Sequence, residues 1–140
     1  MNRFFSSTPL WQNTGLALVR VTLGLFLVYH GWEIFDTAKM NEYMSWDMFK
    51  NSSSMSVMVY MGKAAELVSG ILFIVGFVTR LASLILICTM LYITFFVGNG
   101  KIWYEDQYPF LFVLLGFVFL FTGAGKLSMD HLLFNKNQRR

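Results

Sequence analysis

The sequence has few charged residues, and this scarcity limits the class of protein that it can encode. Only 14% of its 140 residues are charged, whereas an ordinary soluble domain has about 25%. Hydrophobic residues make up 56% of the chain. They lie in long runs, whereas a water-soluble core would interleave them with polar positions at helix or strand period. The composition therefore argues against a soluble globular enzyme.

Cysteine and histidine are also scarce, which excludes several kinds of cofactor site. The single cysteine, Cys88, lies within an apolar run, so the chain has no disulfide framework, CxxC pair or thiolate metal site. The two histidines, His30 and His131, fall near opposite ends of the expected bundle and cannot bind one haem together. No glycine-rich nucleotide loop, P-loop or serine-triad pattern is present. We therefore assign no metal and no other cofactor from the sequence.

Four long apolar segments are present instead. A helix needs roughly 20 residues to cross a hydrocarbon layer of about 30 Å. We therefore expect one all-α domain over residues 1–140, an integral-membrane four-helix bundle. Its expected spans are residues 15–35, 55–78, 81–97 and 108–125, with outer loops at 36–54 and 98–107. The length of the first span and its internal Arg20 argue against a removable signal peptide.

The distribution of basic residues predicts the orientation of the bundle. Six lysines and arginines lie on the side of the termini, and three lie on the other side. The first set is Arg3, Arg80, Lys126, Lys136, Arg139 and Arg140, and the second is Lys39, Lys50 and Lys101. This bias predicts that both termini of a multi-pass membrane protein lie in the cytoplasm. The net charge of +3 then reflects topology, and we expect membrane lipid rather than nucleic acid as a partner because no basic stripe forms.

Ionisable side chains inside the expected spans give the strongest functional indication, because each costs about 2.5–3.5 kcal/mol to insert. Lys63 and Glu66 are three residues apart on one helix, and His30 and Glu33 repeat this spacing. Antiparallel packing of the first two spans places these groups in the outer half of the bundle. The candidate polar pocket consists of His30, Glu33, Lys63, Glu66, Glu105 and Tyr108. It is either a ligand or proton site or an ion-paired staple that fixes helix packing.

A second charged cluster is expected at the cytoplasmic surface. Arg20 shares a helix face with Gly24 and Gly31. Such a stripe of small residues lets membrane helices approach closely. The expected counter-charge of Arg20 is Asp130, with Arg80 near by. We interpret this cluster as structural.

Three segments carry a further pattern in their order and spacing. They are LVRV through HG in residues 18–31, ELVSG through GFVTRLA in 66–82, and YP through GAGKLSMD in 108–130. Together they resemble the DoxX family of small four-span membrane proteins. One position departs from the family pattern, because many relatives have a lysine where this chain has Ile34.

The resemblance implies a four-helix bundle linked to membrane redox chemistry. Family members include subunits similar to those of thiosulfate:quinone oxidoreductase and partners of thiol-redox proteins, while distant relatives act as cargo receptors or assembly chaperones. We therefore expect an accessory, non-catalytic subunit of an inner-membrane complex, with membrane or periplasmic protein subunits as partners.

Two alternatives stay open. The first is a quinone- or quinol-binding oxidoreductase subunit with a proton-handling site. In that subunit Glu66 accepts a proton, His30 donates a hydrogen bond to the quinone, and Lys63 tunes the charge. The second alternative is a membrane assembly chaperone or cargo-binding protein.

Overall fold

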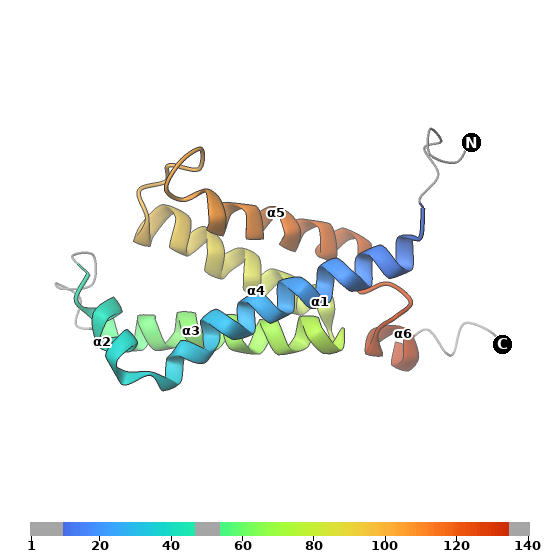
Figure 1. Cartoon of the computed structure of the whole chain (residues 1–140), viewed down its shortest axis with the longest axis horizontal. Helices are drawn as coiled ribbons and strands as arrows, with labels where there is room; N and C mark the ends of the chain where they lie inside the picture. Colours follow the sequence, from blue (N-terminus) through green and yellow to red (C-terminus); the bar gives the residue numbers. More distant parts are fainter. Residues whose placement is uncertain (1–9, 47–53, 135–140) are drawn as a thin grey trace.

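The computed structural model describes residues 10–46 and 54–134, in which every regular element is a helix. In chain order these elements are α1 (Gln12–Gly31), the 3-10 helix η1 (Trp32–Phe35), α2 (Thr37–Met44), α3 (Met55–Val75), α4 (Thr79–Tyr92), the π-helix η2 (Ile93–Val97), α5 (Gln107–Thr122) and α6 (Met129–Phe134). The long helices α1, α3, α4 and α5 form the body, and the short helices α2 and α6 lie at its two opposite ends (Figure 1). The expected all-α fold is confirmed.

The helix lengths match those of a membrane protein. Within the described residues, three stretches are long and apolar enough to cross a membrane, namely Gln12–Phe35, Ser56–Val75 and Thr79–Val97. Helix α5 is equally apolar but has only 16 residues. At 1.5 Å per residue it rises about 24 Å, less than the roughly 30 Å of a hydrocarbon core. The protein is therefore a helical membrane protein with three or four spans.

Two helices end earlier than the apolar runs predict, and glycine explains both ends. Helix α3 stops at Val75 rather than at residue 78, because Gly76 has φ +70° and its N–H donates back to the Leu72 carbonyl over 2.8 Å. Helix α5 stops at Thr122 rather than at residue 125, where Gly123 has φ +72°. Glycine enters this left-handed region without a Cβ penalty and commonly ends helices.

The segment expected as the first outer loop contains the short helix α2. Asp36 begins this helix, since its carboxylate accepts hydrogen bonds from the backbone N–H groups of Ala38 and Lys39 over 2.9 and 3.2 Å. Residues 47–53 of the expected loop lie outside the described part of the chain. The helix matters for the site because it carries Tyr43.

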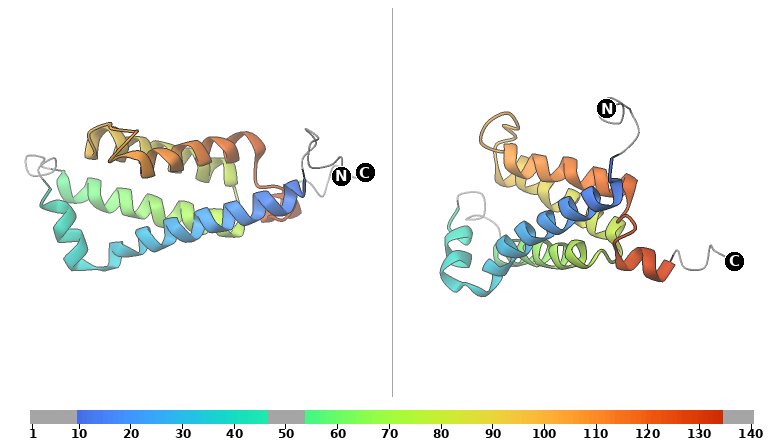
Figure 2. Two further views of the ribbon diagram at one scale, coloured as in Figure 1. Left: turned by 45° about the horizontal axis from the view of Figure 1, so that its top comes forward. Right: turned by 45° about the vertical axis from the view of Figure 1, so that its right-hand side comes forward.

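The long helices pack as a chain of neighbours. Helix α1 packs on α3, α3 on α4, and α4 on α5 (Figure 2). The backbones of α1 and α3 touch closely, because a Cβ on Gly24 would lie 2.7 Å from the carbonyl oxygen of Gly70, and one on Gly31 would lie 2.4 Å from the backbone nitrogen of Leu67. The predicted stripe of small residues on α1 is thus its contact face with α3.

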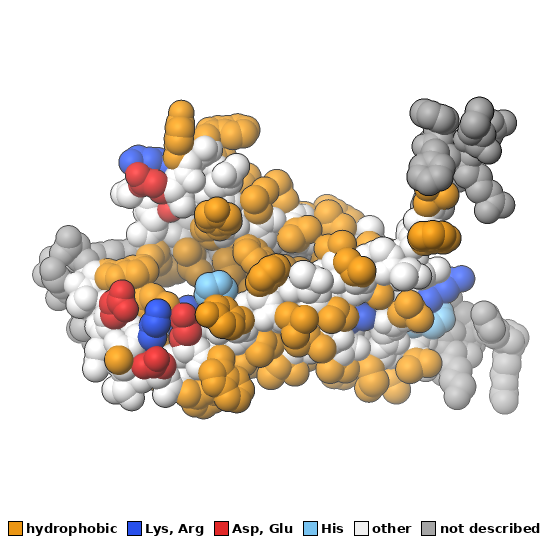
Figure 3. All heavy atoms as spheres, in the orientation of Figure 1, with side chains coloured by type: hydrophobic (Ala, Val, Ile, Leu, Met, Phe, Trp, Pro, Cys, Tyr) orange, Lys and Arg blue, Asp and Glu red, His pale blue; other side chains and the backbone are white. Residues whose placement is uncertain are grey.

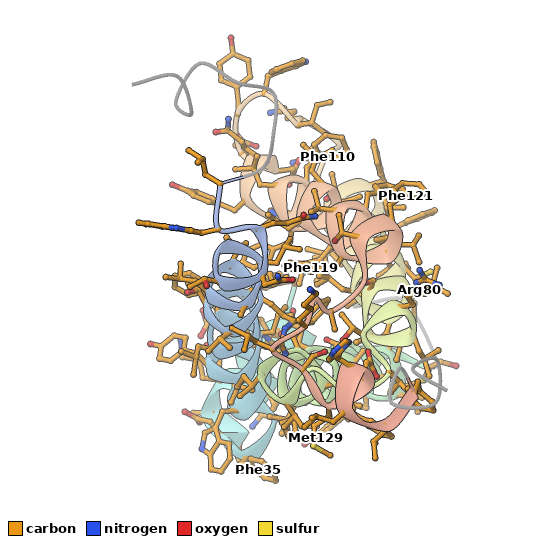
Figure 4. All side chains as sticks on the ribbon, turned by 90° about the vertical axis from the view of Figure 1, so that its right-hand side faces the viewer. Phe35, Arg80, Phe110, Phe119, Phe121 and Met129 are labelled. Carbon is orange, nitrogen blue, oxygen red and sulfur yellow. The ribbon has the colours of Figure 1, made fainter. Side chains whose placement is uncertain are left out.

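An apolar core occupies the middle of the bundle between the two charged ends. Phe73 of α3 and Phe119 of α5 meet edge to face with ring centroids 5.6 Å apart. Figure 4 shows Phe119 directed into the bundle and Phe121 directed outward. Other buried members of this core include Leu23, Leu27 and Leu86. The core fixes the relative positions of α1, α3, α4 and α5.

Candidate functional site

A cluster of charged side chains lies at the end of the bundle that carries α2 (Figure 3). We define the loop-end cluster as Glu33, Tyr43, Lys63 and Glu66. The ammonium nitrogen of Lys63 lies 2.9 Å from Glu33 Oε2 and 3.1 Å from Glu66 Oε2. The side chains of Lys63, Glu33 and Glu66 are 14%, 18% and 6% exposed. One ammonium group therefore bridges two carboxylates in a largely buried site.

Three elements carry the residues of this cluster. Glu33 lies on the 3-10 helix η1 that continues α1, and Lys63 and Glu66 lie one turn apart on α3. Tyr43 reaches the cluster from α2, where its hydroxyl donates a hydrogen bond to Glu33 Oε2 over 2.6 Å. The Lys63 ammonium also lies 4.7 Å from the centroid of the Tyr43 ring, a cation–π distance.

The position of Tyr43 fixes its protonation state. Burial of the hydroxyl, reinforced by the hydrogen bond to the Glu33 carboxylate, raises the pKa of Tyr43 to about 12. The phenol therefore stays a hydrogen-bond donor across the neutral range. The candidate pocket predicted from the sequence did not include Tyr43. The Asp36 cap was the signal that could have placed it on a helix folding back over Glu33.

A pocket of about 230 Å³ adjoins Lys63 and Glu66. It lies between α2, α3 and the end of α4, and most of its wall is apolar or aromatic. Its lining residues are Tyr43, Trp46, Met58, Val59, Gly62, Lys63, Glu66, Thr89, Tyr92, Ile93 and Val97. A mainly apolar pocket with a few convergent polar groups is typical of small-molecule sites. The sequence did not predict the part of this wall that α4 contributes.

The π-helix η2 forms part of this wall. Its wider turn is closed by the N–H of Gly98, which donates to the Ile93 carbonyl over 2.7 Å. The Thr94 hydroxyl donates to the carbonyl oxygen of Met90 over 2.7 Å. The turn places Ile93 and Val97 against the pocket. Single π turns inside α-helices frequently occur at functional sites.

His30 lies beside the loop-end cluster rather than within it. Its ring is exposed and contacts the Tyr29 ring edge to face at 5.4 Å. It makes no hydrogen bond to the carboxylate of Glu33 or of Glu66 among the described residues. It does not line the 230 Å³ pocket.

Two residues that the sequence placed in this pocket lie elsewhere, which corrects that expectation. The Glu105 carboxylate lies 3.3 Å from the Lys101 ammonium in an exposed pair. Tyr108 is 75% exposed at the start of α5. The physical reason is that α5 packs mainly on α4, so its first turn does not reach Lys63. Hydropathy alone does not reveal which helices are neighbours.

The second predicted cluster lies at the opposite end of the bundle, and there the expected ion pair is not formed. The Arg20 guanidinium donates to the carbonyl oxygens of Phe73, Ile74 and Leu127, the last two over 3.2 and 2.7 Å. The first two carbonyls lie at the end of α3, where no helical N–H can reach them, and Leu127 lies in the connection between α5 and α6. Arg20 therefore acts as a cap of α3.

Asp130 makes the complementary contact at the start of α4. Its two carboxylate oxygens accept hydrogen bonds from the backbone N–H groups of Val78 and Thr79 over 2.6 and 2.9 Å. Arg80 lies at the outer edge of α4 (Figure 4) and makes no ion pair among the described residues. The structural interpretation of Arg20 and Asp130 fits this geometry, although each residue binds backbone rather than the other.

These features define a small helical membrane protein with a buried charged cluster and an apolar pocket at one end. The sequence model of the DoxX family matches residues 15–99, more than half of the chain and all of the loop-end cluster. The chain belongs to the DoxX family, which confirms the resemblance seen in its sequence. It is 30% identical over 128 residues, 86% of this chain and 92% of the relative, to an uncharacterized protein of Haemophilus influenzae. No solved structure matches it.

Proposed function

We propose that the protein is a subunit of a bacterial inner-membrane redox complex and binds the headgroup of a quinone or quinol beside Lys63 and Glu66. The observation that carries this proposal is the pocket of about 230 Å³, whose apolar wall is interrupted by this charged pair. Membership of the DoxX family and a bacterial relative support the membrane setting.

The pocket suits a flat ring that carries polar oxygens at its edge. The aromatic rings of Tyr43, Trp46 and Tyr92 supply apolar surface for such a ring. A lysine ammonium group has three N–H donors, and Lys63 directs two of them at Glu33 and Glu66. The third donor is available for a quinone oxygen. Because His30 does not line the pocket, we assign the hydrogen bond to Lys63 instead.

The loop-end cluster also suits proton exchange. Two carboxylates share one ammonium, so the ionised cluster carries one net negative charge in a largely buried site. A proton taken up by this cluster removes the uncompensated charge. Reduction of a quinone to a quinol consumes two electrons and two protons. We assign the proton exchange to Glu66 and the supply of electrons to a redox-active partner subunit.

Binding of a soluble quinone analogue to the purified protein tests this proposal. We expect wild type to bind and Lys63→Gln to bind at least about tenfold more weakly, because a hydrogen bond to a charged group contributes about 1.5–3 kcal/mol. Glu66→Gln removes the charge that holds Lys63 in place and is also expected to weaken binding. Glu105→Gln is the matched control, since it makes the same change in an exposed pair.

Two results would contradict this proposal. Absence of binding to the wild-type protein would show that it has no quinone site. Equal affinities of wild type, Lys63→Gln and Glu66→Gln would place the analogue outside this pocket.

Membership of a complex requires a separate test. Support comes from large exposed aromatic side chains at the loop end, including Trp32 (63% exposed) and Trp103 (80% exposed). These can contact lipid headgroups or a partner. Purification in a mild detergent followed by mass spectrometry is expected to recover the same membrane or periplasmic redox protein in repeated preparations. Repeated recovery of this chain alone would contradict membership of a complex.

The same proposal places both termini in the cytoplasm. Among the described residues, Arg80 and Lys126 lie at the end where α1 begins and α6 lies, and Lys39 and Lys101 lie at the other end. The remaining counted cations, Arg3, Lys50, Lys136, Arg139 and Arg140, lie outside the described residues. A C-terminal alkaline phosphatase fusion is expected to be inactive and a fluorescent protein fusion to be bright. An active alkaline phosphatase fusion with a dark fluorescent protein fusion would show that the C-terminus lies outside the cytoplasm, which would contradict this orientation.

A further inference from the structure

A second and larger cavity lies at the opposite end of the bundle from the loop-end cluster. Its volume is about 610 Å³. It is bounded by the start of α1, the start of α4, the connection over residues 122–128 and the short helix α6. Figure 4 looks onto this end of the molecule. None of the residues assigned above to quinone binding lines it.

The charged lining of this cavity favours an anion. Arg80 and Lys126 line it, and neither side chain forms an ion pair within the described parts of the chain. The acidic residue of the lining is Asp130, and both of its oxygens already accept N–H groups at the start of α4. The carboxylate charge of Asp130 is therefore stabilised by the N-terminus of α4. The side chains of Arg80 and Lys126 have no acidic partner among the described residues.

The position of the cavity along the membrane normal selects the kind of anion. Helix α4 begins at Thr79 and α5 ends at Thr122, so the cavity lies at the level where spanning helices leave the hydrocarbon core. Leu16 and Leu81 add apolar surface to its wall. Basic pockets between membrane helices at this depth bind phospholipid headgroups. We propose that this cavity binds the phosphate of an anionic phospholipid through Arg80 and Lys126.

Titration of the purified full-length protein with phospholipid tests this assignment. We compare phosphatidylglycerol with phosphatidylcholine of the same acyl chains, and read out bound lipid by native mass spectrometry and the midpoint of thermal unfolding. Phosphatidylglycerol is expected to bind and to raise the midpoint, and phosphatidylcholine is not. Each basic residue near the membrane surface contributes about fivefold in affinity, so Arg80→Gln with Lys126→Gln is expected to weaken binding about 25-fold.

The matched control removes two charges at the other end of the bundle. Lys39→Gln with Lys101→Gln changes the net charge equally but touches no residue of this cavity. It is expected to leave phosphatidylglycerol binding unchanged.

Three results would overturn the assignment. Equal binding of the two lipids would show that headgroup charge is not recognised. Equal weakening by the control variant would show attraction to net charge alone. The same rise of the midpoint with inorganic phosphate in place of lipid would identify free phosphate as the ligand. None of these readouts depends on the quinone pocket.

Discussion

Arg20 and Asp130 hold the turn between α3 and α4 from two sides, and they form no ion pair with each other among the described residues. The cation binds carbonyls at the C-terminal end of α3, and the anion binds N–H groups at the N-terminal end of α4. Each charge thus meets the helix end of opposite partial charge. Gly76 lies between them, where a Cβ would be 2.3 Å from Arg20 Nη1.

This arrangement predicts separate losses of stability for the two residues. Arg20→Met is expected to lower the free energy of unfolding by about 3 kcal/mol, because it removes several charge-assisted hydrogen bonds. Asp130→Asn is expected to lower it by about 1–2 kcal/mol as a lost cap. Because the side chains do not pair, the two losses are expected to add within about 1 kcal/mol. Thermal or denaturant unfolding in detergent measures them, and a double variant as stable as Arg20→Met alone would indicate direct pairing.

Glycine on α1 provides a second prediction with an internal control. Gly31→Ala is expected to destabilise the protein by about 1–3 kcal/mol, since its Cβ would press against the backbone of Leu67. Gly15→Ala on the same helix meets nothing within 4 Å. It is expected to be neutral or to stabilise by up to about 1 kcal/mol through helix propensity. Equal effects on the unfolding midpoint would contradict close packing of α1 and α3.

Removal of Lys63 is expected to destabilise the protein more than removal of an exposed lysine. Lys63→Met leaves Glu66, which is 5% exposed, without its cation. Breaking a buried pair in this way costs about 3–5 kcal/mol. Adding Glu66→Gln is expected to recover a large part of the loss. Lys101→Met is the control, because its exposed pair with Glu105 contributes about 0–1 kcal/mol. A greater loss of stability in Lys101→Met than in Lys63→Met would show that burial does not strengthen the Lys63 pair.

The raised pKa of Tyr43 predicts a defined alkaline effect. The folded protein holds the phenolic proton up to about pH 12, whereas an unfolded chain releases it near pH 10. The stabilisation from this group is therefore complete below about pH 10 and declines as the pH rises toward 12. The absorbance of tyrosinate in wild type minus that in Tyr43→Phe is expected to show a midpoint near pH 12. A midpoint near 10 would mean that the hydroxyl is not held by Glu33.

The sequence predicts the long helices well for a simple physical reason. Apolar runs such as the one before Gly76 are direct consequences of the hydrocarbon layer. The same runs do not specify helix ends to the residue, because single glycines such as Gly123 end a helix inside an apolar stretch. They also give no warning of the π turn at Ile93, which depends on how α4 meets its neighbours.

The candidate site is only partly predictable. The pairing of Lys63 with Glu66 follows from helical spacing on a single element. Its extension to Glu33 depends on the contact of α1 with α3, which the glycine stripe indicates. The recruitment of Tyr43 and the absence of Tyr108 depend on the course of the chain after each span. Local composition does not specify tertiary contacts of this kind.

The contacts of Arg20 also determine the order in which parts of the structure can form during synthesis. Arg20 leaves the ribosome 54 residues before Ile74 and 107 residues before Leu127, whose carbonyls it binds. At about 5–20 residues per second, translation separates the first and last of these events by seconds. Until residues 73 and 74 have been synthesised, the Arg20 guanidinium has none of these acceptors, and we expect it to snorkel toward the headgroups. The full set of Arg20 hydrogen bonds can therefore form only after the segment before α6 has been synthesised.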